Sequence, residues 1–246
     1  MSAGSTTGSP RSTRLLHCPT PTRTGVRGSG AIGPVYTPPI DILLICTANQ
    51  CRSAMAEGML RRLLTDHGAH AEIGSAGLLP GGAPATRPAI AVMADRGIDI
   101  SRHVSRTLDP EVVRSTPLII GMAREHVREA VVGCGADVEH TFTLKELVRR
   151  GEWTGPRRPD ETVVAWLDRV AAGRHSADLM GEDDDDIPDP VGRSRAHYQT
   201  TARELDGLVR RLVALMIGGP ARSASYAGSS PSRPVAGETP YAAGGH

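Results

Sequence analysis

The sequence predicts an α/β fold in which a parallel sheet is covered by helices on both faces. Short, continuously apolar runs at residues 41–46 and 117–122 are typical of buried strands. Elsewhere, apolar residues recur every three or four positions, which is typical of helices. Because strand-like and helix-like segments alternate along the chain, we expect one three-layer α/β/α domain with a parallel sheet.

The remaining elements are predicted from the same two patterns. Two further strands are expected, at residues 71–75 and 138–142. Thr143 and Glu146 form a capping-box pattern that marks the start of a helix. Other helices are expected from Ser53 to Gly68 and at residues 87–96, 110–114, 123–132, 160–172 and 194–217.

The two ends of the chain differ from its centre in composition. Residues 1–39 are rich in Ser, Thr, Gly, Pro and Arg and contain no acidic residue, and the segment 218–246 is similarly rich in Gly, Pro, Ser and Ala. Such segments bury too little apolar surface to fold, so both are predicted to be disordered. The N-terminal extension also resembles an organelle transit peptide. The domain is therefore predicted to span residues 40–217.

Composition excludes several classes of protein. The formal net charge is +1, and the 28 basic residues include a single lysine and are spread along the chain, so no nucleic-acid partner is predicted. No apolar run approaches the roughly 18 residues of a membrane span, and residues 1–20 lack a secretory signal. The four cysteines are too few and too irregularly spaced for a disulfide framework. We expect a cytoplasmic protein.

The stretch Cys46-Thr-Ala-Asn-Gln-Cys-Arg-Ser53 joins the first strand to the first helix. Backbone N–H groups of residues 47–52 are expected to form an anion nest at the positive end of that helix. Because a helix N-terminus and a neighbouring arginine stabilise a thiolate, Cys46 is a candidate nucleophile. Arg52 is expected to hold two oxygens of a tetrahedral oxyanion in a bidentate fork.

Two side chains of this loop are predicted to support it. Ser53 is placed to donate its hydroxyl to the Cys46 sulfur, and Asn49 tolerates the left-handed backbone that a tight loop needs. The predicted phosphate-binding loop comprises Thr47, Ala48, Asn49, Gln50, Cys51 and Ser53.

Phosphoryl transfer to sulfur also needs a group that protonates the leaving oxygen and later deprotonates water. Asp189 is the candidate, because Pro188 and Pro190 stiffen the backbone on both sides of it. Two alternatives stay open at this point: a role for Asp189 as no more than a cap of the last helix, and competition for the catalytic role from the neighbouring acids Asp183–Asp186. The acidic run that includes them is predicted to be a solvated loop.

These motifs resemble the low-molecular-weight protein tyrosine phosphatase family over roughly residues 40–217, and in particular bacterial, actinomycete-type members. The resemblance is carried, in the family's order, by Cys46–Ser53, Ser75-Ala-Gly77, Gly97–Ser101 with Ser105-Arg106, Met122–His126 and Asp186–Pro190. It implies four parallel strands in flavodoxin-like order. It also implies that Cys46 forms a phosphocysteine, that Arg52 clamps the phosphate, and that Asp189 acts as general acid and then base.

The resemblance further implies a redox role and a substrate. Cys51 matches a second loop cysteine that forms a reversible disulfide with the nucleophile in the family. The expected partners are phosphotyrosine-containing proteins, among them a bacterial tyrosine kinase. Ala48 replaces a family glycine, and Val191 stands where many members carry a tyrosine that helps to stack a phenyl ring. No cofactor and no metal are predicted.

Two other functions share this loop. Thiol-dependent arsenate reductases have the same fold and loop, but that chemistry usually needs a further pair of closely spaced cysteines, and Cys134 stands alone. A non-catalytic phosphate or partner binder is the second alternative. It is disfavoured because Cys46, Arg52 and Asp189 are all present.

Overall fold

The computed structural model describes residues 41–69, 71–175 and 183–218. The predicted extension at residues 1–39 and the tail after residue 218 lie outside the described residues. The strands are β1 (Ile42–Cys46), β2 (Ile73–Gly77), β3 (Leu118–Gly121) and β4 (Thr141–Thr143). The helices are α1 (Arg52–Asp66), α2 (Arg87–Ala94), α3 (Pro110–Ser115), α4 (Arg124–Arg128), α5 (Leu144–Thr154), α6 (Val163–Ala171) and α7 (Arg195–Ile217). None of the helices in these ranges is both long and apolar enough to cross a membrane.

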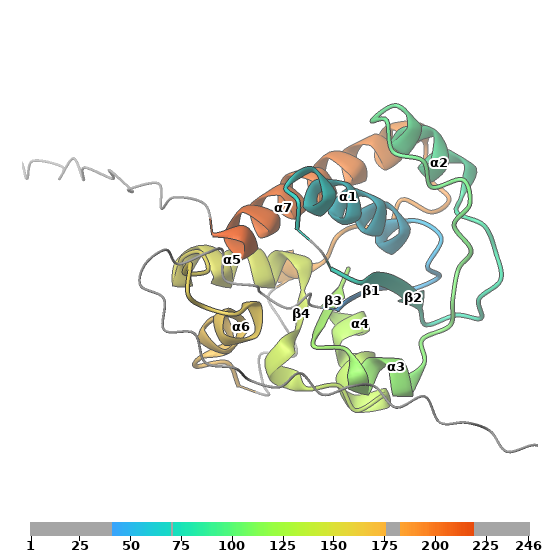
Figure 1. The fold of residues 1–246 in the computed structure, drawn as a ribbon. Helices are drawn as coiled ribbons and strands as arrows, with labels where there is room; N and C mark the ends of the chain where they lie inside the picture. The colour runs from blue at the N-terminus through green and yellow to red at the C-terminus, as the bar shows by residue number, and fades with distance from the viewer. Residues whose placement is uncertain (1–40, 70, 176–182, 219–246) are drawn as a thin grey trace, which may run out of the picture. The chain divides into compact units, whose positions relative to one another are not determined.

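The four strands form one parallel sheet in the order β2-β1-β3-β4, as the resemblance implies (Figure 1). This flavodoxin-like order has a switch point at β1, because the chain leaves β1 first towards β2 and later returns on its other side as β3. Ligands of such sheets bind beyond the carboxyl end of the strands at the switch point. Cys46 is the last residue of β1 and therefore lies at that position.

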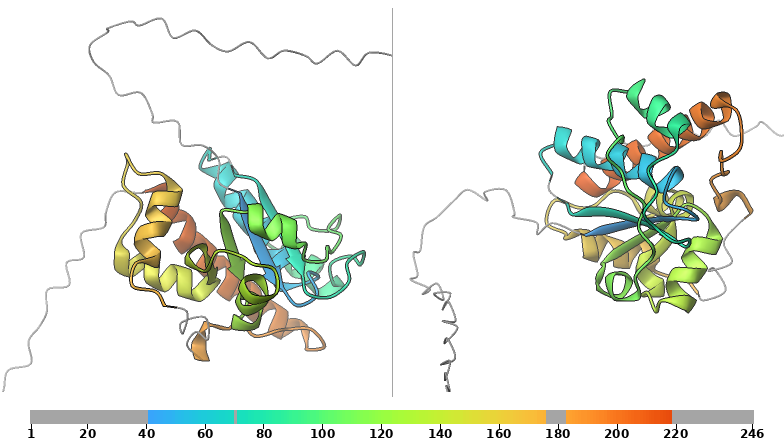
Figure 2. Two further views of the ribbon diagram at one scale, coloured as in Figure 1. Left: turned by 90° about the horizontal axis from the view of Figure 1, so that it is seen from below. Right: turned by 90° about the vertical axis from the view of Figure 1, so that its right-hand side faces the viewer.

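Two layers of helices cover the sheet. Figure 1 and the right-hand view of Figure 2 show α1 and α7 over one face and α3 and α4 over the other. Side chains of β1 alternate between the layers, as strand geometry requires: Ile42 and Leu44 pack with the α1 and α7 side, whereas Leu43 and Ile45 pack with the other. The predicted three-layer α/β/α architecture is thus confirmed.

Local hydrogen bonds shift several predicted boundaries. Residues 138–140 form a 3-10 turn instead of the start of a strand, because the Asp137 carboxylate accepts the N–H of Glu139 and the Thr141 hydroxyl donates to the Asp137 carbonyl. The predicted helix at 123–132 is α4 followed by a π-helical turn, Glu129–Gly133.

Two further predicted limits are also wrong. The helix predicted at 160–172 begins only at Val163, where Thr162 accepts the N–H of Ala165. The second strand lies two residues later than predicted, at Ile73–Gly77.

The start of α5 carries a buried ion pair in place of a complete capping box. Thr143 accepts the N–H of Glu146 at 3.0 Å, as predicted. The Glu146 carboxylate binds Arg174 instead of returning to the cap, with Nε–Oε1 at 2.8 Å and Nη2–Oε2 at 3.1 Å. The side chains are 2% and 5% exposed for Arg174 and Glu146, and the guanidinium lies 4.5 Å from the centre of the Phe142 ring.

Arg174→Leu is expected to lower the free energy of unfolding by about 3 kcal/mol, because it leaves a buried carboxylate without its partner. Urea denaturation measures the change. The matched control is Arg210→Leu, which removes the exposed pair with Asp206 and is expected to cost less than about 1 kcal/mol. Equal losses in the two variants would contradict the prediction.

Candidate active site

The loop between β1 and α1 holds the predicted nucleophile at its start. Cys46 is 3% exposed, and its sulfur lies 3.0 Å from the hydroxyl of Ser53, the second residue of α1. The Ser53 oxygen accepts a hydrogen bond from Asn49 Nδ2 at 2.9 Å, which leaves its own proton free to be donated to sulfur. Ser53 is therefore the donor and the Cys46 sulfur the acceptor.

Asn49 ties the loop to the rest of the sheet edge. Its φ of +52° is the left-handed conformation expected for this position. Its side chain donates to Ser75 Oγ at 2.7 Å and accepts the N–H of Arg106 at 2.9 Å. His103 Nε2 lies 2.6 Å from the backbone carbonyl oxygen of Asn49. The loop is therefore braced from β2 and from the connection that follows α2.

The close packing of the loop on β2 depends on a glycine. A Cβ atom on Gly77 would lie 2.8 Å from the carbonyl carbon of Ala48 and 2.8 Å from the nitrogen of Asn49. Both of those atoms are backbone atoms, so the loop would have to move to admit a side chain. Gly77 therefore lets β2 support the loop directly.

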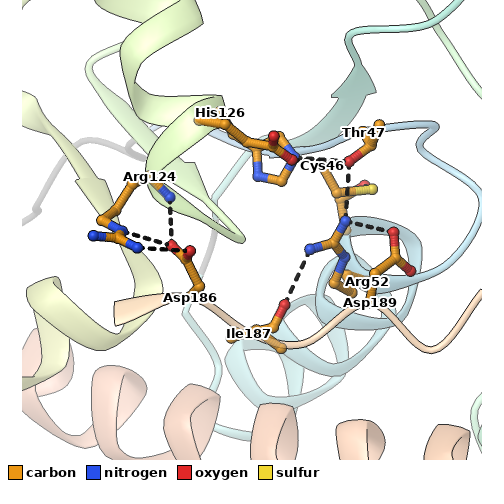
Figure 3. Close-up of polar contacts among 10 residues, drawn as sticks. Cys46, Thr47, Arg52, Arg124, His126, Asp186, Ile187 and Asp189 are labelled. Carbon is orange, nitrogen blue, oxygen red and sulfur yellow. Dashed lines mark hydrogen bonds and ion pairs between the residues drawn. The ribbon is translucent and has the colours of Figure 1, made fainter. Parts of the chain in front are cut away.

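Arg52 is the buried cation of the site. Only 4% exposed, it donates from Nη1 to the Ile187 carbonyl at 3.0 Å and from Nη2 to Thr47 Oγ1 at 3.0 Å and Asp189 Oδ2 at 2.7 Å (Figure 3). Its Nε is buried and has no partner within the described ranges. A buried donor without an acceptor is costly. An oxyanion in the loop would provide that acceptor.

Asp189 reaches this site from 137 residues further along the chain than Arg52. Its Oδ1 accepts the N–H of Val191 at 3.1 Å, which fixes the carboxylate, and its side chain is 40% exposed. It does not cap the last helix, because α7 begins at Arg195 after Ser194. The structure thus brings Cys46, Arg52 and Asp189 together, and all three predicted residues lie within one site.

His126, at α4, was not singled out as a site residue from the sequence. It is fully buried, and its Nε2 lies 3.1 Å from Thr47 Oγ1, the same oxygen that accepts from Arg52. Its Nδ1 is buried without a partner in the described part of the chain. Burial, and next the positive charge of Arg52, lower the pKa of His126 to about 3. A neutral imidazole can hold Thr47 without repelling Arg52.

This pKa predicts a pH dependence of stability. The unfolded chain takes up a proton on His126 near pH 6.5, but the folded protein does so only near pH 3. The contribution of neutral His126 to the free energy of unfolding is fully present above about pH 6.5 and is lost as the pH falls towards 3. In His126→Gln, the free energy of unfolding in urea is expected to fall less steeply between those pH values. A slope equal to that of the wild type and of the exposed-site control His197→Gln would contradict this.

Only part of the described acidic run is the solvated loop that the sequence predicts: Asp184 is exposed, but Asp185 and Asp186 are each held by an arginine. Asp185 is 3% exposed and binds Arg149 at 3.1 Å, and Asp186 binds Arg124. The prediction was wrong for Asp185 and Asp186 because their arginine partners lie on α5 and α4, far away in sequence. Their arginine partners lie outside the Cys46 loop, whereas Asp189 binds Arg52 of the loop itself.

The described cysteines have different surroundings. Cys51 is buried in the loop, and burial, with the nearby charge of Asp189, raises the pKa of its thiol well above the usual range. Cys134 packs on the other face of the sheet, against the cluster that includes Leu43 and Ile45. Cys46 is thus the cysteine whose sulfur contacts a hydrogen-bonding side chain of the loop.

The exposed residues beside the loop set its rim. Leu79 is 50% exposed and its N–H donates to the Thr47 carbonyl, and Val191 is 52% exposed after Pro190. Glu125 is largely exposed and its Oε1 accepts from Thr47 Oγ1 at 3.3 Å. None of these three rim residues is aromatic, and one carries a negative charge.

Comparisons with known proteins identify relatives of this chain. Residues 41–155 match the family described as low molecular weight phosphotyrosine protein phosphatase. A protein-arginine-phosphatase of Bacillus subtilis is 29% identical over 175 residues, which cover 70% of this chain and 94% of that protein. EpsP of Ralstonia solanacearum, a probable low molecular weight protein-tyrosine-phosphatase, is 36% identical over 43% of this chain and 71% of its own length.

Two further relatives extend the comparison. Arsenate reductase of Staphylococcus aureus is 36% identical over 84 residues, 34% of this chain and 60% of that protein. The crystal structure of a low molecular weight protein tyrosine phosphatase from T. tengcongensis superposes with a TM-score of 0.53 at 30% identity, covering 71% of this chain and 97% of that one. The chain belongs to the low molecular weight phosphotyrosine protein phosphatase family.

Proposed function

We propose that residues 40–217 form a phosphatase domain that hydrolyses phosphotyrosine in proteins through a phosphocysteine intermediate. The observation that carries the proposal is the 2.7 Å contact between Arg52 and Asp189, which places a carboxylate beside the arginine of the Cys46 loop. A nucleophile, an anion clamp and a proton donor are the three parts that this reaction requires. The reaction requires Cys46 to be reduced, so we also propose that the protein lies in a reducing compartment, the cytoplasm.

In the first step, the Cys46 thiolate attacks the phosphorus atom. The S–P bond forms as the bond from phosphorus to the tyrosine oxygen breaks, and protonated Asp189 gives its proton to that leaving oxygen. Arg52 and the backbone N–H groups of residues 47–52 stabilise the charge on the other phosphate oxygens. Tyrosine leaves and a phosphocysteine remains.

In the second step, Asp189, now a carboxylate, takes a proton from a water molecule. The water oxygen bonds to phosphorus as the S–P bond breaks, which returns Cys46 to a thiolate and releases phosphate. Ser53 donates to sulfur in both steps, and so favours it as a leaving group. Phosphate departure restores the starting enzyme with Asp189 protonated.

The depth of the sulfur favours a long phosphorylated side chain. At 3% exposure, Cys46 lies below the surface of the loop. A phosphate on tyrosine extends well beyond the peptide backbone, whereas a phosphate on serine or threonine is held close to it. We therefore propose phosphotyrosine proteins as substrates, including an autophosphorylated bacterial tyrosine kinase.

Phosphoarginine in proteins is a second candidate substrate. It is favoured by the B. subtilis protein-arginine-phosphatase, which aligns over 94% of its length, and by the rim of the site. That rim lacks an aromatic residue and carries Glu125, whose carboxylate suits a guanidinium better than a phenyl ring. The same residues would act, with Asp189 protonating a leaving nitrogen.

One competition experiment tests these proposals. The full chain is incubated with two peptides of the same sequence, one with phosphotyrosine and one with phosphoarginine, and phosphate release is measured for each. We expect a higher kcat/KM for the phosphotyrosine peptide. A higher value for the phosphoarginine peptide would transfer the proposal to that substrate. Release from neither would support a non-catalytic binder.

Arsenate reduction is less well supported by the cysteines. Passing a disulfide outwards needs a further thiol that reaches Cys46 or Cys51, but among the described residues Cys134 packs on the opposite face of the sheet. Arsenate-dependent oxidation of reduced thioredoxin measures this activity. We expect none above background.

We also propose that Cys51 protects Cys46 from irreversible oxidation. A peroxide would oxidise the Cys46 thiolate to a sulfenic acid, and the Cys51 sulfur would then displace water to form a disulfide. Both cysteines are reduced and buried in the structure. After mild peroxide treatment, mass spectrometry is expected to show a peptide linked through Cys46 and Cys51. Overoxidised Cys46 beside a free Cys51 would contradict the proposal.

A further inference from the structure

Three consecutive residues at the end of the acidic run are each bound to a different part of the fold. Asp185 binds Arg149 on α5, Asp186 binds Arg124 at the start of α4, and the Ile187 N–H donates to the carbonyl of Met122, just after β3, at 2.9 Å. Figure 3 shows Asp186 and Ile187 between Arg124 and Arg52. Asp189 follows two residues after this point.

The contact between Asp186 and Arg124 fixes both the side chain and the backbone. Asp186 Oδ1 accepts hydrogen bonds from the backbone N–H of Arg124 at 2.8 Å and from its side-chain Nε at 3.2 Å. Asp186 Oδ2 accepts one from Arg124 Nη2 at 3.3 Å. The Asp186 carbonyl also accepts from Lys145 Nζ at 2.9 Å. A planar guanidinium that binds both carboxylate oxygens restricts direction as well as distance.

Ile187 connects this anchored segment to the phosphate clamp. Its side chain is buried in the core, and its carbonyl accepts from Arg52 Nη1 at 3.0 Å. From Ile187 the chain passes through Pro188, whose backbone is stiff, to Asp189. Asp189 therefore has little freedom to move relative to Arg52 while Asp186 stays bound.

We propose that the Asp186–Arg124 ion pair positions Asp189, so that its carboxyl group lies where it can protonate the leaving group. Asp186 and Arg124 contact no reacting atom, so they are positioning residues and not catalytic ones. The proposal rests on the proposed function, because it needs Asp189 to be the general acid. It gives the acidic run a role that composition does not reveal.

Stability alone does not account for this arrangement. The side chains of Arg124 and Asp186 are 30% and 40% exposed, and ion pairs of that exposure contribute little to folding. Their geometry instead affects catalysis, where a displacement of about 1 Å in a catalytic group costs up to roughly 100-fold in rate. An effect on proton transfer is thus expected to exceed any effect on folding.

The test compares two aryl phosphates whose leaving groups differ in their need for a proton. p-Nitrophenolate leaves readily without protonation, but phenolate does not. The ratio of kcat/KM for p-nitrophenyl phosphate to kcat/KM for phenyl phosphate therefore rises when general-acid catalysis is lost. In Asp186→Asn and in Arg124→Gln, we expect kcat/KM for phenyl phosphate to fall about tenfold and that for p-nitrophenyl phosphate to fall about twofold or less. The double variant is expected to match the single ones.

Matched controls separate positioning from general damage. Asp66→Asn removes the exposed Arg62–Asp66 pair on α1 and is expected to leave the ratio unchanged. Asp189→Asn is expected to raise the ratio further than Asp186→Asn does. A wild-type ratio in both anchor variants, with Asp189→Asn raised, overturns the anchor but leaves the proposed function intact. A wild type that hydrolyses neither ester overturns both.

Discussion

Cys46→Ser is expected to lower kcat for aryl phosphate hydrolysis by at least about 10⁴-fold, the scale on which the loss of an enzyme nucleophile acts. A serine hydroxyl is a much weaker nucleophile than a cysteine thiol. It is also a poorer leaving group than sulfur in the second step. Steady-state release of p-nitrophenol measures the loss.

The matched control for this variant is Cys134→Ser. Cys134 is also a buried thiol, but it packs on the other face of the sheet. Its replacement is expected to change kcat by less than about twofold, since distant core changes of this size act on stability. Substantial activity in Cys46→Ser would show that hydrolysis does not proceed through a phosphocysteine.

Asp189→Asn is expected to lower kcat by about 10²- to 10⁴-fold, the usual contribution of a positioned acid or base. The amide keeps the shape of the carboxylate and still accepts the N–H of Val191, but it neither gives a proton to the leaving oxygen nor takes one from water. Because both steps lose the group, rapid quenching should show slower formation and slower breakdown of the phosphocysteine.

Asp184→Asn provides the comparison within the same loop. Asp184 is an exposed member of the acidic run, and its change removes one negative charge from the segment that precedes Asp189 without altering the Cys46 loop. We expect wild-type rates. If Asp184→Asn were as impaired as Asp189→Asn, the loss would reflect the charge of the segment rather than proton transfer.

The parts of the site that could be predicted are those encoded by neighbouring residues. Cys46, Arg52 and Ser53 lie within eight positions of one another, and the strand and helix around them follow from apolar runs and spacing. The order of the sheet and the position of Asp189 relative to this loop came from the resemblance of widely separated motifs. No local pattern states that they meet.

The parts that were missed depend on pairs distant in sequence. Asp185 looks like a solvated acid until Arg149 is known to face it, 36 residues away. His126 stands in one of the motifs that carry the resemblance, but its role comes from contact with Thr47, 79 residues earlier. A contact between separated segments leaves no trace in periodicity or composition, so only the folded arrangement reveals it.

The contact between Arg52 and Asp189 has a consequence for inhibitor design. Because Arg52 already donates to a carboxylate at 2.7 Å, a competing head group has to offer a better acceptor than that carboxylate. A doubly ionised arylphosphonate meets this requirement, whereas a singly charged arylsulfonate of the same shape does not. Inhibitor affinity should therefore follow the second ionisation of the phosphonate, and compounds ranked by shape alone would be ranked wrongly.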